Sequence, residues 1–461
     1  MTDITARIDK INQHDGWESI QIRAMLRLSA QWVVTGARFD TLPEAYASEN
    51  PNVKTAVKAS RLKSGPTQGK VTIFVSPRDG RRYLCPCCGS GCKPMCYEVR
   101  RYAHVPMMEH ACEIQVRIPK LKCFACGSTR QVSFPAAEPR VSYTRPLSER
   151  VLAELMGSTK SKASVKLGVS FDVIDSILDR SIASALRCQD LSGVTGVYVD
   201  ETQFGHGQDY ISVFSDQNHH VIYACRGHDK SVLSMFRDFL IAQGGDPENI
   251  RVFSADMSRA FESGISDLFP NADLVWDRFH LIKMMGEAVN SVRKRTLRRK
   301  EGERLSHVKY VVLRRFDNLS DSQKDRLESV RLYNPELAEA YDMKEVFSQI
   351  VLMRDPTEML TSLEWWFRWV SDSGAPELRK KVEALRCKMD RILAWTRHRV
   401  SNSVCEGINK NIQDIRRSGC GYTNLRNFLN MILLRQGGLT FYIRGMESLS
   451  RFGSSSKGRL L

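Results

Sequence analysis

Residues 194–206, VTGVYVDETQFGH, carry two signals that conflict. The run of small and β-branched residues predicts a central strand that is buried on both faces. The run nevertheless ends on two adjacent acids, and a charge at the end of a buried strand must be solvated, paired or bound to a metal ion. Neighbouring residues of a strand point to opposite sides, so we rank Asp200 above Glu201 as the functional acid.

Strands and helices alternate after this run. YISVF and HVIYACR are predicted strands, SVLSMFRDFLIAQGG is a helix, and IRVFSAD and ADLVWD are two further strands. In a mixed sheet of this βββαβαβ order, the first and fourth strands can lie side by side, and their ends would place Asp200 and Asp256 within reach of the same ions. This is the layout of a ribonuclease-H-like core, and it predicts that Asp200 is charged in order to hold metal.

Two Mg²⁺ or Mn²⁺ ions at such a site would need a third acid. Glu406 in SNSVCEGINKNIQDIRR is the best candidate, and Asn409 and Lys410 lie one turn further along the helix, where they could orient a substrate phosphate. Asp277 and His280 in WDRFHLIK are rivals, because the acid could approach the metals and the imidazole could transfer protons. Equally, Asp277 could be a helix cap and His280 a packed ring. Taken singly, each of these acids is more simply explained as a turn residue or an ion-pair partner. The prediction therefore depends on the arrangement of the acids together.

Eight of the 13 cysteines fall between residues 85 and 126, and the total is odd. This pattern favours metal binding over a disulfide framework. CPCCG and CFACG form two C-x-x-C-G knuckles that supply the four sulfur ligands of one structural Zn²⁺: Cys85, Cys88, Cys123 and Cys126. Six neighbours could replace a ligand or bind a second ion, although we expect the extra thiols to be ordinary small residues: Cys87, Cys92, Cys96, Cys112, His104 and His110.

Residues 146–182 divide into three predicted helices, with a turn at Gly168 and Ser170 as the N-cap of the third. This is the layout of a helix-turn-helix, whose second helix enters the major groove of DNA. The presumed recognition helix carries Asp172, Asp175 and Asp179, which would repel phosphate. The module could therefore serve dimerisation or shape recognition instead, and any three-helix bundle gives a similar pattern.

The net charge of +16 over 461 residues favours an anionic partner, and nucleic acid is the commonest one, although a basic but indifferent surface would look the same. Segment 278–317 holds 12 Lys or Arg against four acids. The candidate DNA-contacting residues are Lys160, Lys162, Ser170, Arg293, Lys294, Arg295, Arg298, Arg299, Asn409 and Lys410. The sequence has no apolar run long enough to cross a bilayer and no signal-peptide pattern, so we expect a cytoplasmic protein without a membrane partner.

The fold class predicted is therefore multidomain α+β. Its segments are an N-terminal helical region with a basic linker (1–69), a zinc ribbon (70–139), a helix-turn-helix (140–187), the first part of a ribonuclease-H-like core (188–282), a basic helical insertion (283–395), the helix of the catalytic Glu (396–446) and a flexible tail (447–461). The tryptophans of EWWFRWV, within the insertion, are more simply helix core than base-stacking groups.

The blocks VYVDE, FSADMS, ADLVWDRFHLIK and SNSVCEGINKNIQDIRRSGCGYTNLRNF, in this order behind the two knuckles, resemble the ISL-three family of bacterial insertion-sequence transposases. The resemblance runs from about residue 82 to residue 437 and implies Asp200, Asp256 and Glu406 as the metal-binding acids of a DDE triad. It also implies double-stranded DNA as partner, both as terminal inverted repeats and as target, and a homodimer or larger assembly in the nucleoid. The rivals are a transposase-derived DNA-binding regulator and a ribonuclease-H-like nuclease without strand transfer.

Overall fold

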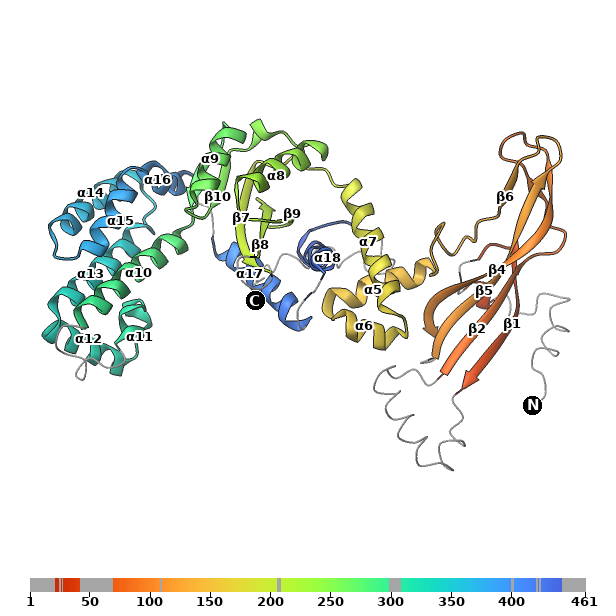
Figure 1. Ribbon diagram of the computed structural model, residues 1–461, viewed down its shortest axis with the longest axis horizontal. Coiled ribbons are helices and arrows are strands. Elements are labelled where there is room, and N and C mark those ends of the chain that lie inside the picture. The colour runs from red at the N-terminus through yellow and green to blue at the C-terminus, as the bar shows by residue number, and fades with distance from the viewer. Residues whose placement is uncertain are drawn as a thin grey trace, which may run out of the picture. The chain divides into compact units, whose positions relative to one another are not determined.

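The computed structural model describes residues 21–24, 26, 28–41, 69–107, 110–204, 209–297, 308–398, 402–419, 422 and 424–441, with the backbone alone for residues 39–41 and 402–406. The chain forms two compact units (Figure 1). Within the described ranges, the first unit comprises the residues up to Arg187 together with Ile415–Arg435, and the second runs from Cys188 to Asp414 and includes Gln436–Gly438.

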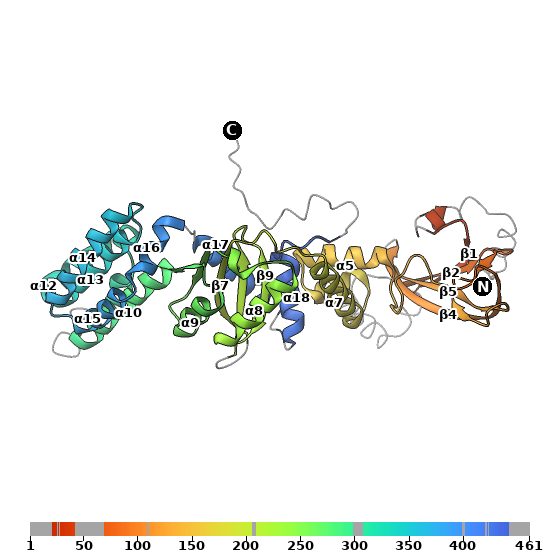
Figure 2. The same ribbon diagram turned by 90° about the horizontal axis from the view of Figure 1, so that it is seen from above.

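The first unit contains a six-stranded sheet (Figure 2). Its strands are β1 (Trp32–Thr41), β2 (Gly69–Pro77), β3 (Tyr83–Leu84), β4 (Gly91–Met107), β5 (His110–Cys123) and β6 (Thr129–Gln131). They lie in the order β1-β2-β5-β4-β3, and β6 pairs with β5 beside this path. Alternate residues of β1, β2 and β5 face a buried core with Trp32, Ile73 and Ile114 at its centre.

The prediction of helix for the N-terminal region is wrong over Trp32–Thr41, which forms β1 and pairs antiparallel with β2. The physical reason is visible in the burial pattern, because Trp32 and Val34 are buried while Val33 and Thr35 are partly exposed. This alternation is the period of a strand. The pairing places β1 in one sheet with residues of the predicted zinc module.

Three helices follow in the same unit, as predicted: α5 (Arg145–Gly157), α6 (Lys160–Leu167) and α7 (Phe171–Arg187). Gly168 ends α6 with a φ of +64°, the left-handed conformation that favours glycine. A fourth helix, α18 (Leu425–Gln436), packs on them although it lies some 240 residues further along the chain. The Arg435 side chain of α18 donates to the carbonyl oxygens of Leu155 at 2.9 Å and Ser158 at 2.6 Å. These bonds satisfy carbonyl groups at the C-terminal end of α5.

The second unit is built on a five-stranded sheet in the order β11-β10-β7-β8-β9. Its elements are β7 (Gly196–Gln203), β8 (Tyr210–Asp216), β9 (Val221–Arg226), α8 (Lys230–Ala242), the 3-10 turn η1 (Pro247–Asn249), β10 (Val252–Ala255), α9 (Arg259–Leu268) and β11 (Asp273–Trp276). This is the predicted βββαβαβ series, with β10 parallel to β7. Phe236 of α8 stacks on Phe214 of β8 at 4.4 Å between ring centroids and packs α8 against the sheet.

The helices after β11 are α10 (Arg278–Leu297), α11 (Lys309–Val312), the 3-10 turn η2 (Phe316–Asn318), α12 (Asp321–Tyr333), α13 (Pro335–Ile350), α14 (Pro356–Asp372), α15 (Pro376–Arg386), α16 (Met389–His398) and α17 (Asn402–Ser418). The helices α10–α16 share one hydrophobic core with the sheet. Trp366 is fully buried there and donates to the carbonyl of Met343 at 2.8 Å, so its predicted core role is confirmed. For Trp365 the prediction of a core role is wrong, because this residue is 55% exposed. The chain returns to the sheet through α16, whose His398 contacts Asp273 of β11 at 2.6 Å. None of the described helices is both long and apolar enough to span a membrane.

Candidate active site and cysteine cluster

Three acids lie at one level across the middle of the five-stranded sheet. The register pairs Val252 with Gly196 on one side and with Asp273 on the other. Continuing both parallel registers to the ends of the strands sets Asp256 level with Asp200 and with Asp277. The predicted proximity of Asp200 and Asp256 therefore follows from the observed pairing of β7 with β10.

Asp200 does not end its strand, contrary to the prediction, because β7 continues to Gln203 and Asp200 pairs there with Val213 of β8. The acid therefore sits within the sheet, where burial raises the pKa of its carboxyl to about 6, and the nearby Asp277 charge acts in the same direction. Glu201 was ranked lower, yet it is also partly buried, and burial raises its pKa to about 6. A site that disfavours its own negative charges is one in which a cation would be stabilised.

Asp277 and His280 form a connected pair at the start of α10. The Asp277 carboxylate accepts from the backbone N–H of Phe279 at 2.7 Å and contacts Nδ1 of His280 at 3.1 Å. The same Nδ1 lies 3.8 Å from a carboxylate oxygen of Asp256. The hydrogen bond to Asp277 raises the pKa of His280. Both predicted roles of Asp277, helix cap and neighbour of the acids, thus occur in one residue.

Helix α17 is attached to β7 by two side-chain contacts. The amide Nδ2 of Asn409 donates to Oδ2 of Asp200, and Nε2 of Gln413, one turn further, donates to the hydroxyl of Thr202. Asp200 and Thr202 lie two residues apart on one face of β7, which matches one helical turn in length. Gln413 was not among the sequence-predicted residues, although its spacing of four from Asn409 was a signal for a shared face.

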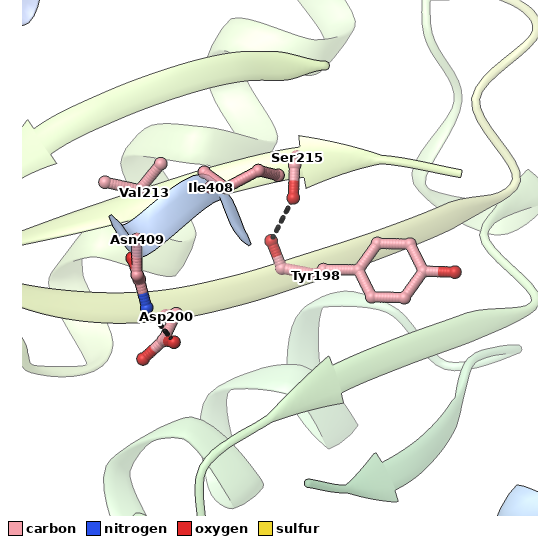
Figure 3. Close-up of a pocket in the computed structure, with 6 residues that line it drawn as sticks. All are labelled: Tyr198, Asp200, Val213, Ser215, Ile408 and Asn409. Atoms are coloured by element: carbon pink, nitrogen blue, oxygen red, sulfur yellow. Dashed lines mark hydrogen bonds between the residues drawn. The ribbon is translucent and has the colours of Figure 1, made fainter. Parts of the chain in front are cut away.

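Asn409 and Asp200 point toward each other in a small pocket that Tyr198, Val213, Ser215 and Ile408 complete (Figure 3). The pocket volume is about 10 Å³, which is close to the space of one water molecule. The Oδ1 atom of Asn409 is buried there and has no hydrogen-bond partner among the described residues. Asn409 thus contacts the carboxylate directly, whereas the neighbouring Lys410 is exposed.

The side chain of Glu406 lies outside the described residues, but its backbone belongs to α17, one turn before Asn409. Among the residues whose side chains are described, Asp200, Asp256, Asp277 and His280 do not form a group of three whose candidate ligand atoms lie within 4.8 Å of one another. A complete divalent-metal site here therefore needs a further ligand. An acid from the first turns of α17 fits this requirement.

The four knuckle cysteines do form such a group in the first unit, with their sulfur atoms all within 4.8 Å of one another. Sγ of Cys85 lies 3.6 Å from that of Cys126, and Sγ of Cys88 lies 3.5 Å from that of Cys123. These separations exclude disulfides. They are close to the edge of about 3.8 Å that a tetrahedron of four Zn–S bonds would have.

Each knuckle is shaped by its own backbone. Gly89 and Gly127 have φ values of +73° and +71°, which a residue with a side chain rarely adopts. The Cys85 and Cys123 amides donate to the carbonyls of Ser90 and Ser128, at 2.8 Å and 2.9 Å. Hydrogen bonding from Ser128 is the main cause that lowers the pKa of Cys85 to about 5, which favours the thiolate that a metal ion needs. The close grouping of the four sulfur atoms shows that the cluster could bind zinc.

The extra thiols differ from these four. Cys92 and Cys112 are buried, Cys87 and Cys96 are exposed, and none of them joins the cluster of four. Burial raises the pKa of Cys112 to about 12, so this thiol is neutral. His104 is buried and its Nδ1 contacts the hydroxyl of Thr144 at 2.7 Å. The expectation that the extra cysteines are ordinary residues agrees with these positions.

The predicted DNA-contacting residues of the helical bundle fall into two groups. Lys162 and Ser170 are exposed, and the hydroxyl of Ser170 accepts from the amide of Val173 at 3.4 Å as an N-cap. Lys160 is largely buried and pairs with Asp175 of α7. Asp175 and its neighbour Asp179 also bind side chains of α18, namely Asn427, Asn430 and Arg426. Two of the three acids that were expected to repel DNA phosphates are therefore bound to other side chains of the protein.

The basic residues of α10 also differ in their surroundings. Lys294 is exposed, and Arg293 donates to Asn290 at 3.0 Å. Arg295 instead donates to Glu377 of α15 at 2.8 Å and to Glu336 of α13, so its guanidinium joins three helices. Arg298 and Arg299 lie outside the described residues.

Comparisons with known proteins identify relatives of this chain. A family model described as "Transposase", that of the ISL-three group, matches residues 197–432, which is half of the chain. The chain is 25% identical over 369 residues to the transposase for insertion sequence element IS1001 of Bordetella parapertussis, covering 78% of this chain and 89% of the relative. It is 21% identical over 356 residues to the transposase for insertion sequence element IS1557 of Mycobacterium tuberculosis, covering 70% and 79%.

The class that the fold and the comparisons define is that of the insertion-sequence transposases. Within it, the chain belongs to the ISL-three family, because the family model spans both the five-stranded sheet and α17.

Proposed function

We propose that this protein is a DDE transposase that cleaves DNA at the ends of an insertion sequence and joins the freed ends to target DNA. In this proposal the second unit is a ribonuclease-H-like core that the helices α10–α16 interrupt. The observation that carries the proposal is the bond from Asn409 to Asp200, since it holds α17 beside the acids of β7 and β10.

The acids Asp200, Asp256 and Glu406 would hold two Mg²⁺ or Mn²⁺ ions. Such ions supply activation of the attacking oxygen and stabilisation of the leaving oxygen in an in-line displacement. Asp200 and Asp256 stand level on adjacent parallel strands. The raised pKa of Asp200 supports this role, because a neighbouring cation would restore the ionised carboxylate.

The remaining groups of the site would position and exchange protons. Asp277 holds Nδ1 of His280 at 3.1 Å and thereby orients the ring beside Asp256. The free edge of the imidazole could then contact the scissile phosphate or carry a proton. Water would cleave the strand to leave a 3′-hydroxyl, and this hydroxyl would attack a phosphodiester of target DNA in a second displacement.

The first unit would recognise the terminal inverted repeats through a zinc-bound cysteine module and the helices α5–α7. Lys162, Ser170, Lys294 and Lys410 are exposed and could contact phosphates, as could Arg293, whereas Arg295 serves the helical bundle. Because two ends must be brought together, we propose a homodimer or a larger assembly. The protein would act in the bacterial cytoplasm, on the DNA of the nucleoid.

The test is strand cleavage on duplexes that carry the repeats flanking this gene, with Mg²⁺ or Mn²⁺ and with EDTA. Glu406→Gln should abolish metal-dependent cutting at the repeat boundary while DNA binding persists. The matched control is Asp414→Asn, an exposed acid on the same helix, which should cut like the wild type. Equal cutting by Glu406→Gln would remove this residue from the site and favour Asp277. Tight binding without any cutting by the wild type would favour the DNA-binding regulator.

A further inference from the structure

Strand β4 carries an unusual solvent-exposed stretch. All residues from Lys93 to Val99 are exposed, on both faces of the strand. In the register that the structure describes, this stretch pairs with β5 alone, because β3 reaches only Gly91 and Cys92. Met95, Tyr97 and Val99 are 57%, 48% and 50% exposed. Several large apolar side chains on one exposed ribbon indicate a surface that a partner covers.

The charge of this β4–β5 ribbon identifies the kind of partner. Residues 91–101 and 117–131 contain seven Lys or Arg and one acid, Glu98. That acid is bound within the ribbon by Arg100 at 3.1 Å and by Gln131. The ribbon therefore presents an excess of positive charge to solvent, which complements the phosphates of DNA.

Aromatic and cationic side chains are interleaved on one face. The register places Val99 opposite Arg117 and Tyr97 opposite Pro119, so Tyr97, Val99 and Arg101 share this face with Arg117. The guanidinium of Arg117 lies 4.8 Å from the ring centroid of Tyr97. Stacking of this kind holds a cation in a fixed place while its outer edge stays available for hydrogen bonds.

Edge pairing with a second protein strand is the alternative use of such a stretch, and the local sequence opposes it. Pro94 has no N–H to donate, and a bulge interrupts the register between Pro94 and Cys96. Lys93, Arg100 and Arg101 would also bring like charges together across a symmetric pair of β4 strands. At Tyr97–Val99 the ribbon is two-stranded, because β6 pairs with β5 only at Lys120–Lys122 and β2 only up to Val116. A two-stranded antiparallel ribbon is one of the few elements that fit into the major groove of DNA.

We propose that the face of the β4–β5 ribbon bearing Tyr97, Val99, Arg101 and Arg117 binds duplex DNA, with the two arginines on phosphates. This inference rests on the proposed function and deepens it, because it names the surface of the first unit that meets the DNA.

The test compares the full-length protein with Arg101→Ala/Arg117→Ala, by fluorescence anisotropy on labelled duplexes that carry the repeats flanking this gene, over a series of salt concentrations. The double variant should bind at least about tenfold more weakly at physiological salt. The slope of log affinity against log salt should fall by about two, because each lost phosphate contact removes about 0.9. The matched control is Arg379→Ala/Lys380→Ala on α15, two exposed cations that should leave both values unchanged.

Tyr97→Ala/Val99→Ala gives a second readout that does not depend on charge. It should weaken binding with an unchanged salt slope, and zinc content and circular dichroism should confirm that each variant is folded. Wild-type affinity and salt slope in both ribbon variants would overturn the proposal. So would a normal DNA affinity combined with the loss of a dimer in sedimentation equilibrium, since the ribbon would then join two copies.

The two proposals fail in different ways. If the ribbon does not bind DNA but the catalytic proposal holds, the ribbon variants bind and cut normally while Glu406→Gln binds without cutting. If the catalytic proposal is wrong, either Glu406→Gln cuts like the wild type or the wild type does not cut at all, whatever the affinity of the ribbon variants.

Discussion

The cysteine cluster and the acidic site are both candidate metal sites, but the chain builds them in opposite ways. The cysteines come from two short turns, each held by its own backbone bonds and a glycine with positive φ. The acids come from β7, the ends of β10 and β11, and α17, elements that span more than 200 residues of sequence. The sulfur atoms already stand at ligand distances from one another, whereas the described acids do not.

In the proposed function, this difference separates a structural centre from a catalytic one. Four sulfurs around one ion leave no open position for a substrate. Among the described carboxylates, Asp277 is buried, whereas the side chain of Asp256 is 41% exposed and therefore open to solvent. A ligand set that is incomplete in the protein alone leaves room for the phosphate oxygens of DNA. The comparison predicts that the two sites respond differently to the loss of one ligand.

Losing one cysteine should have the largest effect. Cys88→Ser should reduce bound zinc from one ion to nearly none per chain and destabilise the module, because binding of a structural zinc contributes on the order of 10 kcal/mol. Metal analysis and thermal unfolding measure both effects. Cys87→Ser is the matched control, since this exposed thiol lies outside the cluster, and it should keep one zinc. The reverse result would assign Cys87 as the ligand.

Loss of one contact in the acidic site should instead lower the rate of DNA cleavage. Asn409→Ala removes the bond that holds α17 to Asp200, and cleavage should fall about 10- to 100-fold, as for other groups that orient metal ligands. DNA affinity should not change. Asn411→Ala, on the exposed side of the same helix, serves as control. Lost affinity with an unchanged cleavage rate would show that Asn409 contacts substrate phosphate instead.

Disturbing the packing of α18 on α7 should have a smaller effect than either of these changes, and the effect should be on stability. In Asp179→Ala, the amide of Asn430 loses its acceptor, which lies at 2.5 Å, and Arg426 loses an ion-pair partner at 3.1 Å. Because Asn430 is buried, we expect a loss of about 1–2 kcal/mol in unfolding free energy. Urea or thermal unfolding measures it. Asp172→Ala, at an exposed position of α7, should cost clearly less, and equal losses would mean that the α18 contacts do not stabilise the bundle.

The smallest expected effect concerns pH. The hydrogen bond with Asp216 raises the pKa of His220 above its usual 6.5. Since the folded-state pKa is the higher one, this pair stabilises the fold fully below pH 6.5 and less as the pH rises through the folded value. The histidine is partly exposed, so the change should stay below about 1 kcal/mol. His220→Gln should flatten the dependence of unfolding free energy on pH over this window, and an unchanged slope would contradict the assignment.

The sequence predicted those features that depend on local pattern or on strand order. The knuckle spacing indicated all four members of the cysteine cluster, and the βββαβαβ series indicated that β7 and β10 are neighbours. Three other features were not predictable in this way. β1 was read as helix because its partner β2 lies far along the chain, and tertiary pairing overrode the apparent amphipathic pattern.

The other two features also depend on partners outside the segment in which the residue lies. Asp200 lies inside its strand because β8 supplies a partner for the residues beyond it, which no pattern within 194–206 reports. The acids of α7 looked like obstacles to DNA binding because their partners in α18 stand some 250 residues away. In each case a polar residue was judged without the neighbour that satisfies it.

Because the acids are widely spaced in the sequence, they are synthesised at different times during translation. Asp200 and Asp256 leave the ribosome early, and Asp256 precedes Glu406 by 150 residues. At about 5–20 residues per second, roughly 8 to 30 seconds pass before the helix with the last acid follows. If Glu406 is the third acid, as proposed, the transposase stays inactive until α17 has been synthesised, and a truncated product lacking α17 has no third acid.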